Sequence, residues 1–202
     1  MTACVVNSNS LLKNNIFVAA TEEFILRKEA IRKPYDVSVA EYCDQFQCND
    51  ADLDDFFANV ALHYDTELLG KTYAWISLSN PRHILGMITL ANDSVKLKLI
   101  SSAALNRLQR GVTNSKRGIN FPAVLIGRLG VSAEYRGRGF NIGSQILDYV
   151  KDWFRSAENK TGCRFIVVDA YNNERTVRFY QKKRIQIPLS HRRRRARLYG
   201  AQ

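Results

Sequence analysis

The apolar residues in the second half of the chain predict a strand, a helix and a second strand, in that order. Residues 123–131 (AVLIGRLGV) are rich in β-branched side chains and continuously apolar apart from Arg128, which indicates a buried strand. Residues 164–170 (RFIVVDA) repeat this pattern. Between them the apolar positions recur at helical spacing, which predicts one buried helix face: Ile142, Ile146, Leu147, Val150 and Phe154. The three elements predict a βαβ unit with parallel strands and a right-handed crossover.

The first half of the chain predicts a helix followed by two strands. Residues 71–78 (KTYAWISL) and 83–95 (HILGMITLANDSV) have strand character, and Asn80-Pro81 between them is a turn pair. The preceding helix would begin within residues 46–64 (FQCNDADLDDFFANVALHY), where four carboxylates favour the positive end of a helix dipole: Asp50, Asp52, Asp54 and Asp55. Its buried stripe would consist of Leu53, Phe56, Phe57, Val60, Tyr64 and Leu68.

A loop rich in glycine and arginine connects the first strand of the βαβ unit to its helix. Gly137, Gly139 and Gly143 carry no Cβ, so the backbone can take positive φ and approach a ligand closely. Free N–H groups and the positive end of the helix converge there, which suits a pyrophosphate, and Arg136 and Arg138 add charge. The glycine spacing fits neither the dinucleotide fingerprint nor the P-loop. The alternative is a tight turn that needs glycine for its shape alone.

This loop resembles the acetyl-CoA-binding motif of the GNAT N-acetyltransferases, which reads Arg/Gln-x-x-Gly-x-Gly/Ala and opens a helix. Arg136 and Gly139 match the first two fixed positions, whereas Asn141 stands at the second glycine position, and the helix start fits as if residues 140–141 were inserted. The resemblance implies that the following residues bind acetyl-CoA: Leu129, Gly130, Val131, Arg136, Gly137, Arg138, Gly139, Asn141, Ile142, Gly143 and Ser144.

A second stretch, residues 172–182 (NNERTVRFYQK), follows the second strand directly and supports the same resemblance. GNAT enzymes carry Asn-x-x-Ala-x-x-x-Tyr at this place, and Asn173, Thr176 and Tyr180 fall on those offsets, with Thr in place of Ala. The resemblance implies that Asn173 starts a helix at the cofactor site and that Tyr180 protonates the departing thiolate. The alternative for Tyr180 is a core aromatic beside Phe179.

The fold that the resemblance implies is α/β, with a GNAT-like mixed sheet around a central βαβ acetyl-CoA-binding unit. The first strand of that unit would diverge from its parallel neighbour near its end, and pantetheine would fill the gap. Backbone N–H groups near residues 129–131 would then stabilise the oxyanion as the amine attacks the thioester. Glu134 and Asp93 are candidates for a general base, but both are more simply interpreted as surface carboxylates.

The first half of the chain is also similar to a narrower group. The pattern F-x-C-x-x-x-x-L-D-D-F, ahead of Y-x-W and I-x-G-x-x-T-L, is similar to the GNAT-type toxins of bacterial toxin–antitoxin pairs. This implies acetyl transfer from acetyl-CoA to the amino group of aminoacyl-tRNA, which blocks translation, with an antitoxin protein as a partner. Two alternatives stay open: acetylation of a protein or small-molecule amine, and a non-catalytic nucleic-acid-binding module on a GNAT scaffold.

The net charge of +11 comes mainly from two basic clusters. Residues 94–133 contain no acidic residue and hold the first cluster: Lys96, Lys98, Arg107, Arg110, Lys116, Arg117 and Arg128. The second cluster lies near the end of the chain: Lys183, Arg184, Arg192, Arg193, Arg194, Arg195 and Arg197. Clustered basic residues are typical of nucleic-acid binding. We expect the first cluster, beside the predicted active site, to contribute more to binding RNA than the second.

The end of the chain departs from the GNAT pattern. GNAT chains continue from the tyrosine motif into a Gly-Phe pair that opens a sixth strand, and no such pair follows Tyr180. Only residues 185–189 (IQIPL) resemble a short strand, and residues 190–202 show no apolar alternation. We therefore expect the C-terminal strands to be missing or altered. Three interpretations of this basic tail stay open: an RNA-binding tail, a solvated disordered end, and a reading-frame change that replaced the native C-terminus.

The length of 202 residues predicts one domain with two appendages. We expect an N-terminal arm at residues 1–22, a GNAT domain at 23–189 and the basic tail at 190–202. No apolar run reaches membrane-spanning length and no signal peptide is evident, so we expect a cytoplasmic protein with no membrane contact. The four cysteines lack metal-binding spacing, which predicts reduced thiols and no metal: Cys4, Cys43, Cys48 and Cys163. The sequence leaves a homodimer open.

Overall fold

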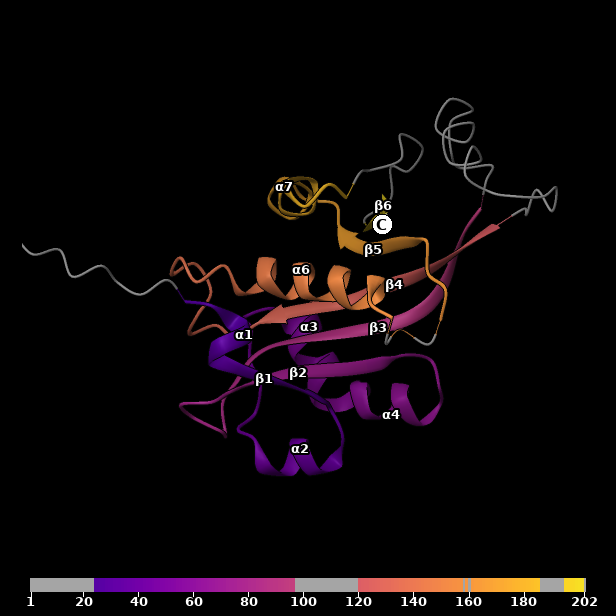
Figure 1. Ribbon diagram of the computed structural model, residues 1–202. Coiled ribbons are helices and arrows are strands. Elements are labelled where there is room, and N and C mark those ends of the chain that lie inside the picture. Colours follow the sequence, from indigo (N-terminus) through magenta and orange to yellow (C-terminus); the bar gives the residue numbers. More distant parts are fainter. Residues whose placement is uncertain (1–23, 97–119, 158, 160, 186–194, 202) are drawn as a thin grey trace, which may run out of the picture.

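A mixed sheet forms the centre of the computed structural model, which describes residues 24–96, 120–157, 159, 161–185 and 195–201 (Figure 1). Six strands lie in the order in which they occur in the chain, and every neighbouring pair is antiparallel except β4 and β5, which are parallel. The strands are β1 (Ala30–Pro34), β2 (Lys71–Ser77), β3 (Ile84–Lys96), β4 (Asn120–Val131), β5 (Phe165–Tyr171) and β6 (Arg195–Ala201).

Helices cover both faces of this sheet. One face carries α1 (Leu26–Glu29), α6 (Ile142–Arg155) and α7 (Glu174–Lys182), whose buried residues share one apolar core with β2, β3, β4 and β5. The other face carries α2 (Val37–Tyr42), α3 (Ala51–Asp55), a π-helical turn at Phe56–Val60, and α4 (Ala61–Thr66), which form a second core. In Figure 1 the helix α6 lies along one side of the sheet and α3 along the other. This three-layer α/β arrangement confirms the predicted fold class.

The predicted βαβ unit consists of β4, α6 and β5. Four apolar residues of α6 are buried against the sheet as the helical spacing predicted, and they are Ile142, Ile146, Leu147 and Val150. Gly86 of β3 lets this helix approach closely, because a Cβ there would lie 2.7 Å from Cδ1 of Ile146. Both β4 and β5 contribute to the core, which explains their nearly continuous apolar sequences.

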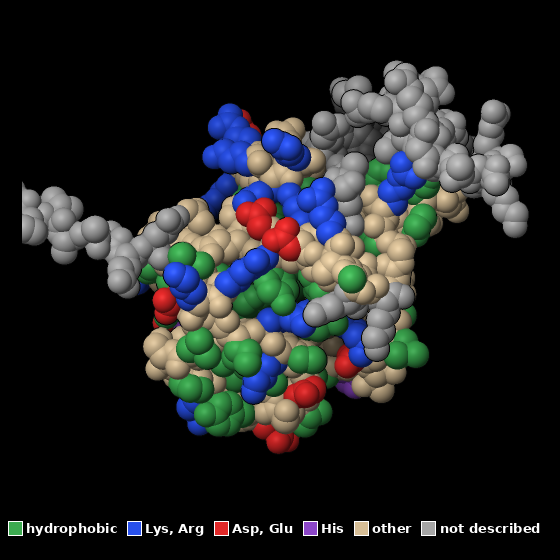
Figure 2. All heavy atoms as spheres, in the orientation of Figure 1, with side chains coloured by type: hydrophobic (Ala, Val, Ile, Leu, Met, Phe, Trp, Pro, Cys, Tyr) green, Lys and Arg blue, Asp and Glu red, His purple; other side chains and the backbone are tan. Residues whose placement is uncertain are grey.

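Ion pairs connect the helices on the α6 face. Arg27 of α1 pairs with Asp152 of α6, and Lys183 after α7 pairs with Asp148. Figure 2 shows Lys and Arg side chains spread over this face with a few carboxylates among them. Exposed pairs of this kind contribute only about 0–1 kcal/mol each. The apolar packing beneath them therefore holds α6 on the sheet.

The predicted helix in the first half exists as one unbroken run from Ala51 to Thr66, but it contains a π-helical turn and ends before Leu68. The π-helical turn separates α3 from α4 and buries Phe56 and Phe57. Leu68, which was predicted to be buried, is 84% exposed and has a φ of 56°. The chain turns out of the helix at this residue, so the buried stripe ends before it. The strands β2 and β3 and the turn at Asn80-Pro81 match the prediction.

The end of the chain contradicts the expectation that residues 190–202 contain no strand. Residues 195–201 form β6, which pairs antiparallel with all seven residues of β5. An edge strand is held by backbone hydrogen bonds to one neighbour and commonly carries charged residues, so apolar alternation is a poor guide to it. Most of the predicted strand at 185–189 lies outside the described residues, as do Arg192, Arg193 and Arg194.

Most of the first basic cluster also lies outside the described residues. These positions are Lys98, Arg107, Arg110, Lys116 and Arg117, which follow β3 and precede β4. Their expected role in RNA binding therefore stays a prediction.

Candidate active site

The parallel strands β4 and β5 pair over four residues and then separate. Their register runs from Ala123 opposite Phe165 to Ile126 opposite Val168. Gly127 follows as a bulge, because β3 pairs Thr89 with Arg128 and Leu90 with Ile126. A bulge bends its strand and ends local pairing. The remaining part of β4 therefore faces the end of β5 without pairing to it, as the resemblance implied.

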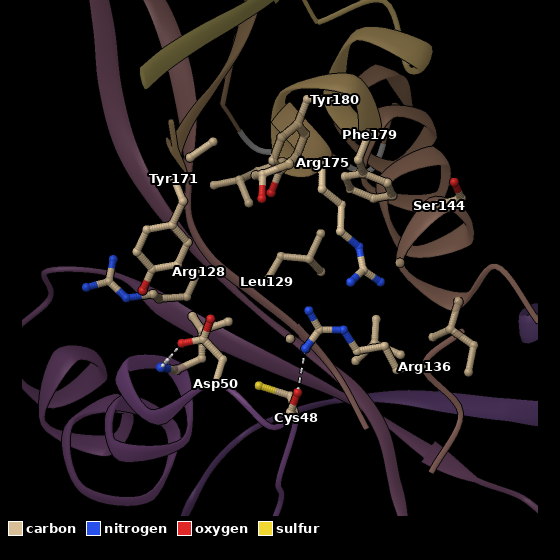
Figure 3. Close-up of a pocket in the computed structure, with 18 of the residues that line it drawn as sticks. Cys48, Asp50, Arg128, Leu129, Arg136, Ser144, Tyr171, Arg175, Phe179 and Tyr180 are labelled. Atoms are coloured by element: carbon tan, nitrogen blue, oxygen red, sulfur yellow. Dashed lines mark hydrogen bonds between the residues drawn. The ribbon is translucent and has the colours of Figure 1, made fainter. Parts of the chain in front are cut away.

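A cleft of about 860 Å³ opens where the two strands separate. Its walls come from five parts of the chain (Figure 3): residues 126–131 of β4, the loop and helix start at 135–144, residues 169–171 of β5, helix α7, and residues 48–53 before and within α3. Segments from both faces of the sheet thus meet around one cavity. Its size is within the range of small-molecule sites in proteins.

The loop at the start of α6 takes left-handed backbone conformations at three positions. Gly137 has a φ of 81° and Gly139 a φ of 86°, and Cβ atoms at these two residues would meet nothing within 4 Å. These glycines therefore allow the left-handed backbone conformation of the loop, and they leave open space at the wall of the cleft. Asn141 has a φ of 52°, and its side-chain Nδ2 donates to the carbonyl of Gly139 at 3.0 Å.

The left-handed conformation of Asn141 explains the departure from the GNAT motif. Asparagine is one of the few residues besides glycine that tolerate positive φ. The position at which the motif has glycine therefore has a left-handed backbone in this chain with asparagine in place. Gly143 has a different role, because a Cβ there would lie 3.2 Å from Cγ2 of Val131 and 3.5 Å from the ring of Phe179. It allows close packing of α6 against β4 and α7.

The N-terminus of α6 faces the cleft. Ile142, Gly143 and Ser144 line it, and the N-cap residue Asn141 makes no side-chain capping bond. The first-turn N–H groups of a helix have no partner within the helix, and its dipole is positive at this end. With the open loop beside it, this 14-residue helix presents N–H donors to an anion in the cleft.

Three arginines lie near this helix start, with different roles. Arg136 lines the cleft, and its guanidinium donates to the backbone carbonyl of Cys48 at 2.7 Å. Arg138, which was also predicted to bind the cofactor, is not among the residues that line the cleft. Arg175 on α7 was not predicted, yet its side chain reaches into the cleft toward Arg136 (Figure 3). Two guanidinium groups that approach from opposite walls favour an anionic ligand between them.

A sequence signal for Arg175 does exist. Arg175, Phe179 and Lys182 all line the cleft, and their i, i+4, i+7 spacing places them on one face of α7. The predicted cofactor residue Asn173 does not line the cleft. Its side chain accepts from the N–H of Thr176 at 2.9 Å and thereby caps α7.

Tyr180 lies on α7 at the wall of the cleft and is 6% exposed. Its ring packs edge-on against Phe179 with the ring centroids 5.0 Å apart. Burial raises the pKa of the Tyr180 phenol well above its ordinary value of 10. In this environment the hydroxyl group stays protonated over the whole neutral range.

Neither of the predicted general-base candidates lines the cleft. Glu134 lies 3.6 Å from Nε2 of His83, and Asp93 accepts from the N–H of Ser94. The carboxylates that do line the cleft are Asp50, Asp52, Asp169 and Glu174. Asp50 and Asp52 belong to the segment that sequence analysis had assigned only to the helix dipole.

Cys48 also lines the cleft, and burial together with the neighbouring Asp54 raises the pKa of its thiol to about 12. A thiol with this pKa is almost entirely neutral at pH 7 and is a poor nucleophile. No group of three or more His, Cys, Asp or Glu with metal-binding geometry occurs in the part of the chain that the structure describes. Within that part, no helix is long and apolar enough to cross a membrane.

The family model described as "Acetyltransferase (GNAT) family" matches residues 40–184. The chain belongs to the GNAT acetyltransferase family. This membership confirms the resemblance and identifies the protein as an acetyl-CoA-dependent N-acetyltransferase, which favours an enzyme over a non-catalytic scaffold. No curated protein sequence matches this acetyltransferase significantly.

Solved structures similar to this acetyltransferase include GNAT-type toxins. A tyrosine-to-phenylalanine mutant of KacT is 18% identical with a TM-score of 0.68, covering 86% of this chain and 95% of that chain. AtaT complexed with acetyl-methionyl-tRNAfMet is 19% identical with a TM-score of 0.65, covering 84% and 94%. AtaTR bound with acetyl-CoA is 18% identical with a TM-score of 0.64, covering 86% and 94%. At these identities the likeness supports the fold.

Proposed function

We propose that this acetyltransferase transfers the acetyl group of acetyl-CoA to the amino group of aminoacyl-tRNA. The observation that carries the proposal is the cleft between β4 and β5, with Tyr180 on its wall. The divergence of the two strands supplies the space for a thioester, and the tyrosine supplies a proton donor. The choice of acceptor is supported by the likeness to AtaT, which has been solved with acetyl-methionyl-tRNAfMet.

The residues present fit the chemistry of coenzyme A. The pyrophosphate would lie on the loop and helix start, where open glycines, N–H donors and two guanidinium groups converge; the residues are Arg136, Gly137, Gly139, Asn141, Ile142, Gly143, Ser144 and Arg175. The backbone of residues 129–131 would pair with the pantetheine amides, since this part of β4 does not pair with β5. Arg138 would add charge at the edge of the loop, and Asn173 would act through its cap on α7.

The reaction would be a direct attack of the amine on the thioester carbonyl. Backbone N–H groups of residues 129–131 would stabilise the oxyanion, and loss of one such donor costs about 3–4 kcal/mol where it has been measured. Tyr180 would then protonate the departing thiolate. Burial raises the pKa of the Tyr180 phenol, so its hydroxyl group carries the proton when the thiolate departs.

The amine of an aminoacyl ester suits this site. An α-amino group has a pKa of about 8, so part of it is neutral at pH 7. Acetylation of that amine would block translation, and a cognate antitoxin would then be needed to restrain the enzyme. The solved complex of an AtaT mutant with the C-terminus of the antitoxin AtaR supports this toxin-like setting.

A protein or small-molecule amine is the second candidate acceptor, and one observation favours it. Four carboxylates line the cleft, and they would attract a cationic amine but repel RNA phosphates: Asp50, Asp52, Asp169 and Glu174. Both candidates share the same cofactor site. The identity of the acceptor therefore has to be tested directly.

The test is acetylation of charged tRNA by the purified protein. After incubation with acetyl-CoA and aminoacyl-tRNA, the ester is hydrolysed and the released amino acid is examined by mass spectrometry. We expect an N-acetylamino acid. A parallel reaction with uncharged tRNA is the control. If coenzyme A is released with a peptide or polyamine acceptor but charged tRNA stays unmodified, the second candidate replaces the first.

A further inference from the structure

The four aspartates around the start of α3 have distinct roles in the structure. Asp50 caps the helix by accepting from the N–H of Leu53 at 3.2 Å. Asp54 accepts from the N–H of Cys48 at 2.7 Å, which holds the segment before the helix. Asp55 accepts from a side-chain amide of the same helical region. These three carboxylates have local structural partners.

Asp52 also bonds to a residue far away in the sequence. Its Oδ2 accepts from the phenol of Tyr171 at 2.6 Å, across a separation of 119 residues. Both residues line the cleft. Tyr171 is the last residue of β5, so the bond joins α3 to the end of the strand that diverges from β4. It holds the carboxylate of Asp52 at the cleft wall.

This wall lies across the sheet from Tyr180. The helix α3 precedes the π-helical turn in the core on one face, whereas Tyr180 belongs to the core on the other face. In Figure 3 Tyr180 enters the cleft from α7 at the top, whereas the Tyr171 ring lies at the left edge and points toward the side that carries Asp50. A thioester between β4 and β5 would therefore have a proton donor on one side and Asp52 on the other.

We propose that Asp52 binds the ammonium group of the acceptor and accepts its proton, and that Tyr171 is a positioning residue for this carboxylate. The inference rests on the proposed function in one respect, namely that the acceptor is an amine. The acceptor enters as R–NH3+, and one N–H proton passes to the Asp52 carboxylate. The nitrogen lone pair forms the bond to the acetyl carbon, and the carbon–sulfur bond breaks.

The remaining protons balance without another reactant. Tyr180 gives its proton to the departing thiolate, and the second proton leaves the new amide nitrogen and restores the phenol directly or through water. The proton on Asp52 then passes to solvent. The net products are the acetylated amine, coenzyme A and one proton.

Two other carboxylates, Glu174 and Glu134, fit this role less well. Glu174 forms an ion pair with Arg178 on the same helix, on the side of the cleft that carries Tyr180. Glu134 pairs with His83 outside the cleft. The charged groups that line the cleft with Asp52 come from its own segment, β4, the loop before α6, β5 and α7: Asp50, Arg128, Arg136, Asp169, Glu174, Arg175, Arg178 and Lys182. The titratable side chains of Cys48, Tyr135, Tyr171 and Tyr180 line it as well.

The experiment compares the full-length parent with Asp52→Asn, Tyr171→Phe and the matched control Asp55→Asn. The asparagine keeps the shape of the side chain and can still accept from Tyr171, but it carries no charge. At pH 6.5 we expect Asp52→Asn to lower kcat/KM for aminoacyl-tRNA about 10²-fold, as for other lost proton-transfer groups. Tyr171→Phe should lower it about tenfold, and Asp55→Asn should leave it unchanged.

The pH profile separates this role from a structural one. Without the carboxylate only the neutral amine reacts, so the deficit of Asp52→Asn should be largest below the amine pKa of about 8 and shrink above it. The thermal shift produced by coenzyme A should stay at the parent value, which shows that the variant is folded. A deficit that is equal at every pH, or full activity, overturns the inference.

The proposed function and this inference fail in different ways. If the parent acetylates no charged tRNA, the acceptor assignment fails, and the same variants are compared on polylysine and spermidine. With these amines, whose pKa is about 10, the deficit should persist to higher pH. If Asp52→Asn equals the parent on every amine that the parent acetylates, or if the parent acetylates none of them, the inference fails.

Discussion

The guanidinium of Arg136 donates a hydrogen bond of 2.7 Å to the backbone carbonyl of Cys48. The two residues are 88 positions apart, and the bond joins the glycine loop before α6 to the segment that leads into α3. Arg136 thus stabilises the shape of the cleft while it contributes positive charge to it. This contact connects the loop that would hold the cofactor with the segment that leads to Asp52.

Substitution of Gly139 tests whether the glycine loop before α6 binds the pyrophosphate of coenzyme A. Gly139→Asp places an anion in the loop and forces a non-glycine residue to a φ of 86°, which costs about 1–2 kcal/mol. Coenzyme A should raise the melting temperature of the parent, because a ligand that binds the native state stabilises it. We expect this shift to disappear in the variant. Gly162→Asp, at an open position outside the cleft, should keep the shift. A full shift in Gly139→Asp would place the coenzyme elsewhere.

Substitution of Tyr180 tests the proton donor. Tyr180→Phe keeps the packing against Phe179 but removes the hydroxyl group. We expect kcat to fall by a factor of about 10²–10⁴, with unchanged binding of acetyl-CoA and an unchanged melting temperature. Steady-state kinetics and thermal shift measure the two properties separately. Turnover at the parent rate would show that Tyr180 is only a core aromatic.

The raised pKa of Tyr180 also predicts the alkaline behaviour of the enzyme. A phenol whose pKa is raised by burial keeps its proton at pH values where an exposed tyrosine begins to ionise. We therefore expect kcat to show no loss from Tyr180 ionisation between pH 8 and pH 10. A kcat that falls with an apparent pKa near 9, and a Tyr180→Phe variant in which that fall is absent, would contradict this expectation.

The two arginines on α7 allow a matched comparison. Arg175 reaches into the cleft toward Arg136, whereas Arg178, which also lines the cleft, is held in an ion pair with Glu174. Arg175→Ala should weaken coenzyme A binding about tenfold, as expected for a lost hydrogen bond to a charged group. Arg178→Ala should have little effect. Titration calorimetry with coenzyme A and with pantetheine, which lacks the pyrophosphate, should show the loss for coenzyme A only.

The state of Cys48 predicts direct transfer without an acyl-cysteine intermediate. Its thiol lines the cleft, but a pKa of about 12 leaves almost no thiolate at pH 7–8. We expect Cys48→Ala to keep its activity within a few-fold and to lose about 1 kcal/mol of stability. Double-reciprocal plots should intersect, as in a sequential mechanism. Parallel plots together with an inactive Cys48→Ala would support a ping-pong route instead.

The C-terminal strand β6 predicts a structural cost for truncation. Removing residues 190–202 leaves β5 as an unpaired edge, because β6 pairs with all of its residues. We expect the melting temperature to fall by more than about 4 °C, which corresponds to a loss of at least 1–2 kcal/mol. Replacing Arg192, Arg193 and Arg194 by glutamine keeps β6 and should leave the melting temperature unchanged. Only these substitutions can test an RNA-binding role of the tail independently of stability.

The local patterns of the sequence were sufficient to predict the centre of the fold. The apolar runs of β4 and β5 and the helical spacing of Ile142, Ile146 and Leu147 predicted the βαβ unit. A helix that buries one face has apolar residues at helical spacing, and a strand that is buried on both faces is continuously apolar. The glycine loop and the position of Tyr180 followed from motif spacing. The pattern did not extend to α1, β1 and α2, whose short lengths contain too few turns or alternations to stand out.

Contacts between distant residues were decided only by the tertiary structure. The sequence by itself determined a GNAT domain, the glycine loop and the tyrosine of α7, because each depends on residues close together along the chain. Only the fold brought Asp52 to Tyr171 and Arg175 into the cleft, and only backbone pairing with β5 made a strand of the basic end. Such contacts depend on how the sheet and helices pack in space, so they cannot be predicted from the pattern of neighbouring residues along the chain.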